Sequence, residues 1–412
     1  MKFLRRTLLV TIIAALMLPM TAFAADLPSI YGKEALVVDI KTGEIIYGKN
    51  IDQKVYPAST TKLMTSLLLA EHNGKTDILK YTESAKKQPE YSLNTNFKTM
   101  KIGETMTADD VMKALMLYSA NDIAYMLADN VAGDSSKFID MMNKKAADLG
   151  LKNTHFTSPN GLHDPDHYTT PYELSVIGMA AYKNAWVKEV IGTKKATITT
   201  SDNRPIAIEN RNKLLGLYGC TGGKTGFTNQ AGKCLVAFFN RDGRELAGVV
   251  MQSVFDLNDT AVFNDMKKII DYSYSLKRTT LYSDGQTIKT FDVKYKPLGF
   301  GFTKTISIPV IVKGDVKYYE NDINKKEMKP EIKLSDINVW KLGSDSKIGT
   351  LTLSQRGAKP TFELVTSVSR SKIIKDNILI YAGILLLILL LLVFIFVVLH
   401  NLHRGSKKRR FY

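Results

Sequence analysis

The spacing of apolar residues predicts alternating strands and helices over the first two thirds of the chain. Apolar and polar side chains alternate through residues 33–51 around a turn at 41–44, as in a hairpin. Pro57 suits the first turn of a helix, and residues 63–70 are almost all apolar or small. Such a helix is enclosed by protein rather than lying on a surface. An α/β (α+β) domain built around this helix is therefore expected.

Further helices and strands follow in the same region. The apolar positions predict helices over 107–118, 122–131, 138–149, 171–182 and 259–274. They predict short strands within 196–215, a hairpin over 222–239 turning near Asn229, and a strand over 246–253. Residues 81–104 are polar and contain Pro89 and Gly103, so loops with short strands are expected there. We expect one domain over residues 25–276.

The pattern changes near Lys277. Residues 280–366 contain only short alternating runs separated by glycine, asparagine and lysine, with no long helical period. This pattern is typical of a small all-β sandwich, which we place at 277–366. Residues 367–377 are polar and are expected to form a short stalk.

Both ends of the chain carry membrane signals. Basic residues precede an apolar run that ends in Ala22-Phe23-Ala24, which predicts a signal peptide over residues 1–24. Residues 378–399 contain no charged side chain and would span about 33 Å as a helix, enough to cross the hydrocarbon core. We therefore expect a transmembrane helix over 378–400. The basic tail, 401–412, should stay in the cytoplasm by the positive-inside rule.

Composition narrows the classes of binding partner that the protein can have. The 412 residues are 45% hydrophobic, enough for a sizeable core, and the net charge is +16. No zinc finger or other nucleic-acid motif accompanies this charge, so an anionic membrane or wall polymer is a better partner than nucleic acid. Cys220 and Cys234 are not expected to pair. In a hairpin turning near Asn229 they would be offset by about 16 Å, unless the segment before the strand folds back.

Candidate chemistry begins at the buried helix. Ser59 and Lys62 are three residues apart, so their side chains project from one face. A partly desolvated lysine can lose its charge and act as the base that activates a serine. A Ser-x-x-Lys motif alone is weak, because Ser84 and Ser369 begin others in this chain.

Two further motifs follow in chain order, Ser119-Ala120-Asn121 and Lys224-Thr225-Gly226. With Ser59-x-x-Lys62 they make the trio of penicillin-interacting serine enzymes. Ser119 lies between two predicted amphipathic helices, where a tight turn can hold it rigidly. The literal Ser-Asp-Asn at Ser201 and the second Lys-Thr-Gly at Lys41 fall instead in predicted hairpin turns.

With the trio placed, the sequence resembles the D-alanyl-D-alanine carboxypeptidases among the low-molecular-mass penicillin-binding proteins. The resemblance runs from about residue 30 to 274, and more faintly to about 366. It includes the stretches Tyr56–Met64, Tyr118–Asp122, Asn160–Asp164 and Gly223–Thr228. Two departures are small: Ala120 replaces a usual glycine, and Thr221-Gly222 replaces a common Asp-Gly pair. The implied fold is a penicillin-binding/β-lactamase-like transpeptidase domain followed by the β-sandwich, and the expected C-terminal transmembrane helix replaces the amphipathic anchor found in many relatives.

The resemblance also implies a role for each reacting residue. Ser59 would attack the carbonyl between two terminal D-alanines, forming an acyl-enzyme and releasing the last D-alanine. Lys62 would take the serine proton. Ser119 would relay a proton to the leaving amine, and Lys224 would tune the charge of the cluster. Asn121 would hold the substrate backbone.

Binding groups are carried over in the same way. The backbone N–H groups of Ser59 and Phe227 would form the oxyanion hole. Thr225, next to Gly226 in its motif, and Arg211 match positions that hold the free carboxylate of the substrate. The expected substrates are peptidoglycan stem peptides ending in D-Ala-D-Ala, and the expected inhibitors are β-lactams. No metal or other cofactor is implied, and the expected location is the bacterial cell membrane, with the catalytic domain outside.

Three other interpretations stay open. A class A β-lactamase would carry a Glu-x-x-Leu-Asn segment after the Ser-x-Asn turn, and the segment beginning at Glu173 does not match. The histidines and aspartates of 155–167 could suggest a metallopeptidase, but they lack the His-Glu-x-x-His spacing. A wall-binding scaffold without activity would tolerate loss of Ser59, whereas an enzyme would not.

Overall fold

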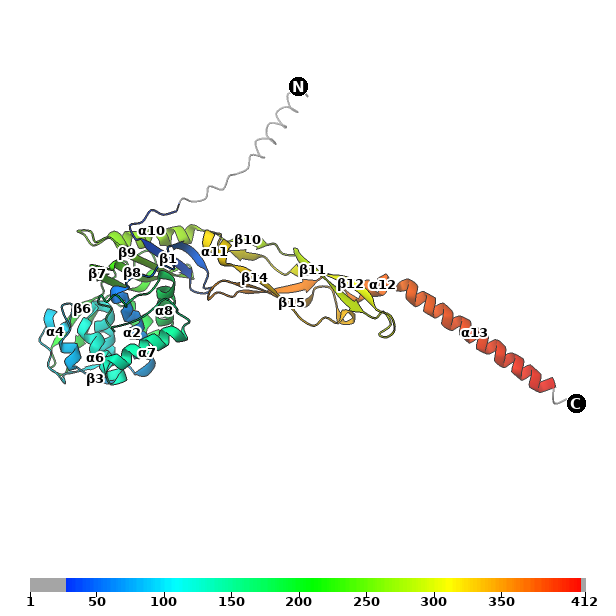
Figure 1. Cartoon of the computed structure of the whole chain (residues 1–412), viewed down its shortest axis with the longest axis horizontal. Coiled ribbons are helices and arrows are strands. Elements are labelled where there is room, and N and C mark those ends of the chain that lie inside the picture. The colour runs from blue at the N-terminus through cyan, green and yellow to red at the C-terminus, as the bar shows by residue number, and fades with distance from the viewer. Residues whose placement is uncertain (1–26, 409–412) are drawn as a thin grey trace, which may run out of the picture. The chain divides into compact units, whose positions relative to one another are not determined.

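The computed structural model describes residues 27–408, with side chains up to residue 403. The chain divides into two compact units. The first contains residues 27–38 and Tyr47–Leu276, and the second contains Asp39–Ile46 and the residues from Lys277 onward. In Figure 1 the first unit runs from blue to green and most of the second from yellow to red. The predicted signal peptide and the last residues of the predicted basic tail lie outside the described residues.

A five-stranded sheet forms the centre of the first unit, in the order β2-β1-β9-β8-β7. Its strands are β1 (Glu34–Asp39), β2 (Ile45–Lys49), β7 (Cys220–Thr228), β8 (Gly232–Arg241) and β9 (Arg244–Ser253). The two predicted hairpins are thereby confirmed. Strand β7 pairs with β8 alone and is an edge of the sheet, so one of its sides remains open for other contacts.

Helices cover both faces of this sheet. On one face, helix α10 (Ala261–Ser275) puts Met266 into the space that a Cβ on Gly248 would fill. On the other, helix α8 (Pro171–Lys183) brings Gly178 so close that an added Cβ would lie 3.0 Å from Val236 Cγ1. Strand β8 is consequently buried on both sides. This explains why it is a continuous apolar run and does not alternate.

The remaining helices of the first unit surround α2 (Lys62–His72), which is buried from Lys62 to Leu69. They are α3 (Glu83–Lys86), α4 (Leu93–Asn96), α5 (Ala108–Lys113), α6 (Asn121–Ala132), α7 (Ser135–Asp148) and α9 (Ala185–Ile191). Two small sheets pair β3 (Ile78–Lys80) with β4 (Thr105–Thr107), and β5 (Lys195–Thr199) with β6 (Pro205–Glu209). The predicted buried central helix is therefore confirmed.

The structure differs from the sequence expectations at three places. Residues 81–104 contain the short helices α3 and α4 where short strands were expected, and the Thr82 side chain caps the first of them. Helix α9 was not expected, because its seven residues are too few for a clear helical period. The predicted helix over 107–118 changes at Ala114 into a π-helical turn, η2 (Ala114–Tyr118).

The second unit is dominated by strands, as predicted. A five-stranded sheet has the order β11-β12-β16-β15-β14, and β10 pairs with β13. The strands are β10 (Thr279–Tyr282), β11 (Thr287–Tyr295), β12 (Lys304–Val312), β13 (Val316–Tyr318), β14 (Lys329–Leu334), β15 (Ser346–Ser354) and β16 (Thr361–Thr366). Strands β12 and β16 pair only through Ile311 and Val312. The sheet is thus two hydrogen-bonded halves joined at a short seam.

One hydrophobic core serves both sheets of this unit. Ile308 and Val310 of β12, Leu351 of β15 and Val316 of β13 all belong to it and are fully buried. Buried residues alternate with more exposed ones along β12 and β15, which is the sandwich pattern expected from the sequence. The short helix α11 (Asp322–Glu327) and the 3₁₀ turn η3 (Val339–Lys341) complete the connections.

The segment expected to be a stalk contains a helix. Residues Arg370–Asp376 form α12, whose Ile373 is fully buried in the core of the second unit. Polar composition misled the prediction because a single apolar residue fixes this helix. Helix α13 (Ile378–Lys408) follows, and its stretch Ile378–His403 is long and apolar enough to cross a membrane.

The two cysteines are both free and buried. Cys234 lies opposite Gly226 in the β7–β8 ladder, and Cys220 lies opposite Phe239. The register differs by one residue from the one assumed for the sequence estimate. In this register the two residues still stand several ladder positions apart.

Candidate active site

Ser59 lies in a 3₁₀ turn, η1 (Ala58–Thr61), directly before α2. The turn is held by Thr60, whose hydroxyl donates to Pro57 O at 2.6 Å. Ala58 has a φ of +49°, a conformation that a non-glycine residue adopts only when its surroundings impose it. Lys62 is the first residue of α2, so one rigid element carries both the serine and the lysine.

Lys62 is fully buried, and its amine faces three oxygens. Its Nζ lies 2.9 Å from Ser59 Oγ, 3.0 Å from Asn121 Oδ1 and 2.8 Å from the carbonyl oxygen of Asn160. The amide and carbonyl oxygens can only accept. A neutral amine has two N–H groups for these two acceptors and one lone pair left for the Ser59 proton. The geometry thus suits a neutral Lys62.

Electrostatics favour the same protonation state. Burial, followed by the nearby Arg211 cation, lowers the pKa of Lys62 to about 7. The Asp122 carboxylate acts in the opposite direction on the pKa of Lys62, but its oxygens are held by other groups. It accepts hydrogen bonds from the backbone N–H groups of Leu93 and Asn94, both at 3.0 Å, and from the Tyr81 hydroxyl.

Ser119 and Asn121 come from the turn between η2 and α6. Ser119 has a φ of +77°, so the chain reverses sharply at this residue. The Asn121 Nδ2 group donates to the carbonyl oxygen of Glu90 at 2.9 Å. This bond fixes the orientation of the amide and turns its oxygen towards Lys62. The turn therefore presents one hydroxyl and one oriented amide to the same space.

Strand β7 supplies the third motif. Lys224 is buried, and its Nζ lies 2.9 Å from Ser119 Oγ and 2.9 Å from Thr225 O. Burial and then the Lys62 cation place the pKa of Lys224 well below its usual range. A Cβ on Gly226 would lie 3.0 Å from the backbone nitrogen of Ser59. Only glycine lets the strand pass so close to the serine turn.

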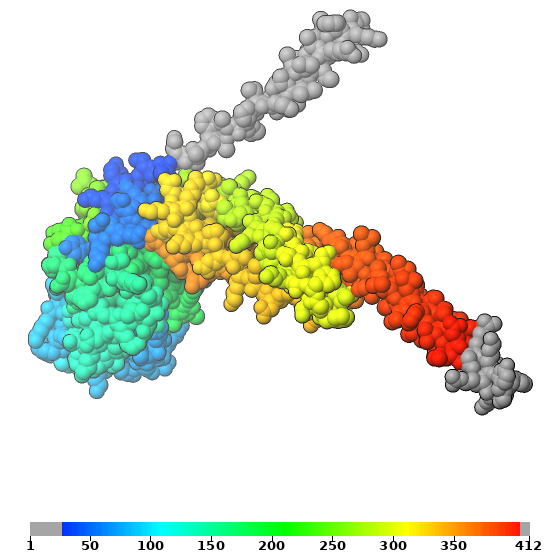
Figure 2. All heavy atoms as spheres, turned by 45° about the vertical axis from the view of Figure 1, so that its right-hand side comes forward, coloured from blue at the N-terminus to red at the C-terminus, as the bar shows by residue number. Residues whose placement is uncertain are grey.

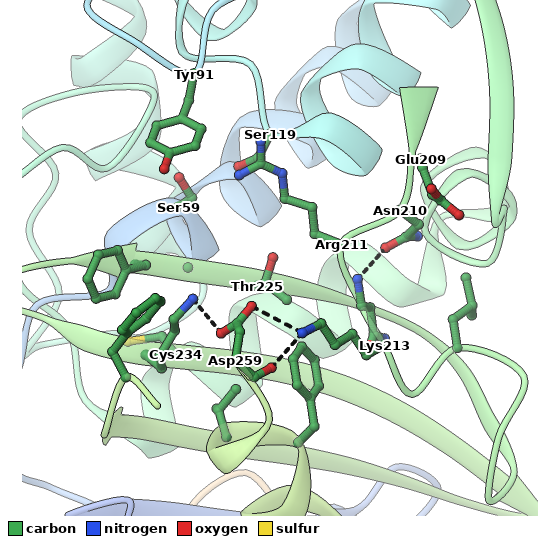
Figure 3. A pocket seen from close by; sticks show the side chains of 18 of the residues that line it. Ser59, Tyr91, Ser119, Glu209, Asn210, Arg211, Lys213, Thr225, Cys234 and Asp259 are labelled. Atoms are coloured by element: carbon green, nitrogen blue, oxygen red, sulfur yellow. Dashed lines mark hydrogen bonds and ion pairs between the residues drawn. The ribbon is translucent and has the colours of Figure 1, made fainter. Parts of the chain in front are cut away.

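Arg211 completes the group. Its guanidinium lies over the ring of Tyr118, at 4.6 Å, and over that of Tyr91, at 4.9 Å. Ser59, Ser119, Arg211 and Thr225 line one open cleft of about 980 Å³, and Figure 3 shows the Arg211 side chain extending into it towards Ser119. Phe227 also lines the cleft and is 41% exposed. The structure thus brings all the predicted site residues together.

Two parts of the site were not predicted. The first is the carbonyl oxygen of Asn160, which accepts a hydrogen bond from the Lys62 amine. At the next residue, a Cβ on Gly161 would collide with the backbone oxygen of Ala58. The stretch Asn160–Asp164 contributed to the family resemblance, but a backbone carbonyl leaves no signal of its own in a sequence. The second is the packing of the Arg211 guanidinium on aromatic rings. It was not predicted, because Tyr91 lies in a segment whose apolar residues show no helical or strand period.

The other motif copies lie outside the cleft lining. The Ser84 hydroxyl contacts the Asp129 carboxylate, Lys41 lies in the β1–β2 turn, and Ser201 lies between β5 and β6.

The histidine-rich loop has a structural role at this site. His167 is buried, and its Nε2 lies 2.8 Å from Thr61 Oγ1, while its Nδ1 accepts from the backbone N–H of Thr157 at 3.1 Å. Burial lowers the pKa of His167 to about 4, so the ring is neutral. Residues 27–408 contain no group of three His, Cys, Asp or Glu side chains arranged to hold a metal ion.

Glu173 does not take the position that a β-lactamase would require. Its carboxylate accepts from the backbone N–H groups of Lys152 and Asn153, at 2.9 and 3.0 Å, and from the Thr154 hydroxyl at 2.6 Å. It is fully used in holding this loop and does not line the cleft.

Comparison with known proteins gives a consistent result. A family model described as D-alanyl-D-alanine carboxypeptidase matches residues 21–254. The chain is 30% identical over 327 residues to D-alanyl-D-alanine carboxypeptidase DacF of Bacillus subtilis (strain 168), covering 79% of this chain and 82% of that protein. It is 32% identical over 268 residues to the D-alanyl-D-alanine carboxypeptidase of Streptomyces sp. (strain K15), covering 62% of this chain and 91% of that protein.

Solved structures agree on the fold. The crystal structure of a D-alanyl-D-alanine carboxypeptidase from Mycobacterium tuberculosis H37Rv has a TM-score of 0.57 at 28% identity, covering 62% of this chain and 96% of that one. That of DacD from Francisella tularensis has a TM-score of 0.63 at 19% identity, covering 86% of this chain and 98% of that one, and supports the fold alone. With its motif trio assembled in one cleft, the chain belongs to the D-alanyl-D-alanine carboxypeptidase family of serine peptidases.

Proposed function

We propose that this serine D,D-carboxypeptidase removes the terminal D-alanine from peptidoglycan stem peptides through an acyl-enzyme on Ser59, and that β-lactams acylate the same serine. The observation that carries the proposal is the amine of Lys62, 2.9 Å from Ser59 Oγ and fixed by two acceptors. A lysine so placed has its lone pair directed at the serine proton.

Acylation begins with transfer of the Ser59 proton to Lys62 as Oγ attacks the carbonyl carbon of the penultimate D-alanine. Negative charge develops on the carbonyl oxygen, and the N–H groups of Ser59 and Phe227 would stabilise it. One such donor is typically worth about 3 kcal/mol of barrier. The close approach of Gly226 to the Ser59 nitrogen supports this assignment, because Phe227 follows Gly226 directly.

Breakdown of the tetrahedral intermediate requires a proton on the departing amine. Ser119 Oγ is held by Lys224 Nζ at 2.9 Å and would pass that proton to the leaving D-alanine. The C–N bond breaks, and the proton taken from Ser59 replaces the one given up by Ser119. Water then attacks the acyl-enzyme with Lys62 again as base, which restores the free serine.

Substrate binding follows from β7 being an edge strand. Every second residue of such a strand leaves its N–H and C=O groups open, and an extended peptide can pair with them. Asn121, oriented by its bond to Glu90 O, would contact the peptide from the opposite wall. Arg211 and Thr225 would hold the free terminal carboxylate, since a guanidinium fork matches a carboxylate in shape and charge.

We further propose that the enzyme is a single-pass protein of the bacterial cell membrane. Helix α13 has the length and composition of a membrane span over Ile378–His403. With the predicted signal peptide and the basic tail, the positive-inside rule places the catalytic unit outside the cytoplasm and the C-terminal tail inside.

Mass spectrometry of the full chain in detergent after benzylpenicillin addition tests the catalytic proposal. We expect an adduct that lasts for minutes to hours and maps to Ser59. The S59A variant should form no adduct, whereas S84A, which alters another Ser-x-x-Lys motif, should react normally. An adduct lost within seconds would indicate a β-lactamase. The absence of any adduct on the parent protein would overturn the catalytic proposal and favour a wall-binding scaffold without activity.

A further inference from the structure

The loop between β11 and β12, residues 296–303, exposes two phenylalanines. Phe300 is 70% exposed and Phe302 is 53% exposed. Gly299, before the first ring, and Gly301, between the two rings, both have φ near +80°, a backbone conformation that other residues rarely adopt. Two exposed aromatic rings at one loop tip are unusual for a surface that meets only water, and such patches mark interaction sites.

The base of this loop is tied to the start of the proposed membrane helix. In the first turn of α13, the Tyr381 hydroxyl donates to the carbonyl oxygen of Pro297 at 3.1 Å. Asn377, between α12 and α13, is buried. It donates to the Tyr295 hydroxyl at 2.7 Å and accepts from Lys304 Nζ at 3.0 Å. Tyr295 and Lys304 are the residues that flank the loop on its two strands.

These contacts fix the depth of the loop. The apolar run of α13 begins at Ile378, so the first turn of this helix lies where water gives way to lipid. A loop bonded to that turn lies at the same level. In Figure 2 the yellow atoms around residue 300 lie beside the orange atoms at the start of α13.

We propose that the 296–303 loop is a second membrane contact, in which Phe300 and Phe302 insert into the lipid interface beside α13. Aromatic side chains favour this zone of the bilayer. Inserted apolar side chains would reach roughly 5–10 Å into the boundary between headgroups and acyl chains. The inference rests on the proposed anchoring by α13 and extends it.

The charge around the loop matches an anionic lipid surface. Basic residues flank it on both strands and continue along α12: Lys294, Lys296, Lys304, Arg370, Lys372 and Lys375. Their ammonium and guanidinium groups would meet lipid phosphates as the rings enter the interface. A single helix leaves the attached unit free to tilt and swivel, whereas a helix and a loop together restrict both motions.

The test uses full-length protein reconstituted into vesicles of phosphatidylcholine, with or without phosphatidylglycerol. Single cysteines at F300C, I332C or L390C carry an environment-sensitive fluorophore, and the native cysteines are buried and should stay unlabelled. Lipids with a nitroxide near the headgroup or deep in the acyl chain then report depth by quenching. Ile332 is an exposed apolar control in β14 of the same unit.

We expect the F300C label to shift to the blue and to be quenched most by the shallow nitroxide, with a larger shift when phosphatidylglycerol is present. The I332C label should show neither effect, and the L390C label should be quenched most by the deep nitroxide. Quenching at L390C without quenching at F300C would overturn the inference and keep the anchor. Absence of quenching at L390C would overturn the anchor itself.

A second set of variants excludes insertion driven by the fluorophore. The label is moved to T303C, with the two phenylalanines intact or replaced in F300S/F302S. We expect the double replacement to abolish quenching of this label, while penicillin labelling of Ser59 is unchanged, because the residues lining the catalytic cleft all lie within 59–263. Equal quenching with and without the phenylalanines would also refute the proposal.

Discussion

Acidification is expected to stop acylation of Ser59 with a midpoint near pH 7. In the proposed mechanism acylation requires Lys62 to be neutral, because a charged ammonium has no lone pair for the serine proton. Burial and the Arg211 cation lower the pKa of Lys62 to about 7 from the ordinary value of 10.5. The group is thus charged below pH 7 and neutral above it, so activity rises with pH through this range.

The size of the effect follows from the titration. The reactive neutral fraction of Lys62 is about half at pH 7 and falls to about 1% at pH 5, because each pH unit changes the ratio tenfold. The acylation rate should therefore drop about 50-fold between pH 7 and pH 5. In R211Q one cation is removed, so the pKa of Lys62 rises and the midpoint moves to higher pH.

The assay is the second-order rate of labelling by a fluorescent penicillin, measured from pH 5 to pH 9. A β-lactam suits this purpose because its own carboxylate stays ionised over the whole range. R211K keeps the positive charge and serves as the matched control, with a midpoint close to that of the parent. A flat profile for the parent protein, or equal midpoints for R211Q and R211K, would refute the reasoning.

Three further outcomes are expected. G161A places a Cβ on the Ala58 oxygen at a φ of +79°, so it should lower the free energy of unfolding by at least about 2 kcal/mol and abolish penicillin labelling; unaltered urea curves and labelling would contradict this. His167 has a pKa of about 4, against 6.5 when exposed, so between these pH values the unfolded chain binds a proton at this ring and the folded chain does not. Stability should thus fall by about 3 kcal/mol as pH drops from 6.5 to 4, and H167Q should flatten that slope. R211L should reduce kcat/KM about 10- to 100-fold for a peptide with a free terminal carboxylate, and far less for its amide; equal losses would argue against carboxylate binding.

Much of the site was readable from the sequence because its chemistry is local. Ser59 and Lys62 share one turn, Ser119 and Asn121 share another, and Lys224 begins a motif on one strand. Within each of these three motifs, backbone geometry over a few residues sets the relative positions of the side chains. The order of the motifs and the apolar pattern around them were sufficient to separate them from the copies at Ser84, Ser201 and Lys41.

The errors have a common cause. Helix α9 is too short to reveal a period and α12 carries too few apolar positions to do so, and each is stabilised by packing against parts of the chain distant in sequence. Ile373 is the one residue of α12 that is buried in the core of the second unit. Local pattern cannot report a contact whose partner is far away in sequence.

The sequence by itself determined the α/β and all-β units, the catalytic trio and the apolar C-terminal helix, since periodicity and short motifs express local forces. Only the tertiary structure decided the pKa of Lys62, because the pKa is lowered by burial and by Arg211, which lies far away in the sequence. It also decided that the Tyr381 hydroxyl donates a hydrogen bond to the carbonyl oxygen of Pro297, which places an aromatic loop beside the first turn of the apolar C-terminal helix. Such long-range contacts arise when the chain packs, so no short stretch of residues encodes them.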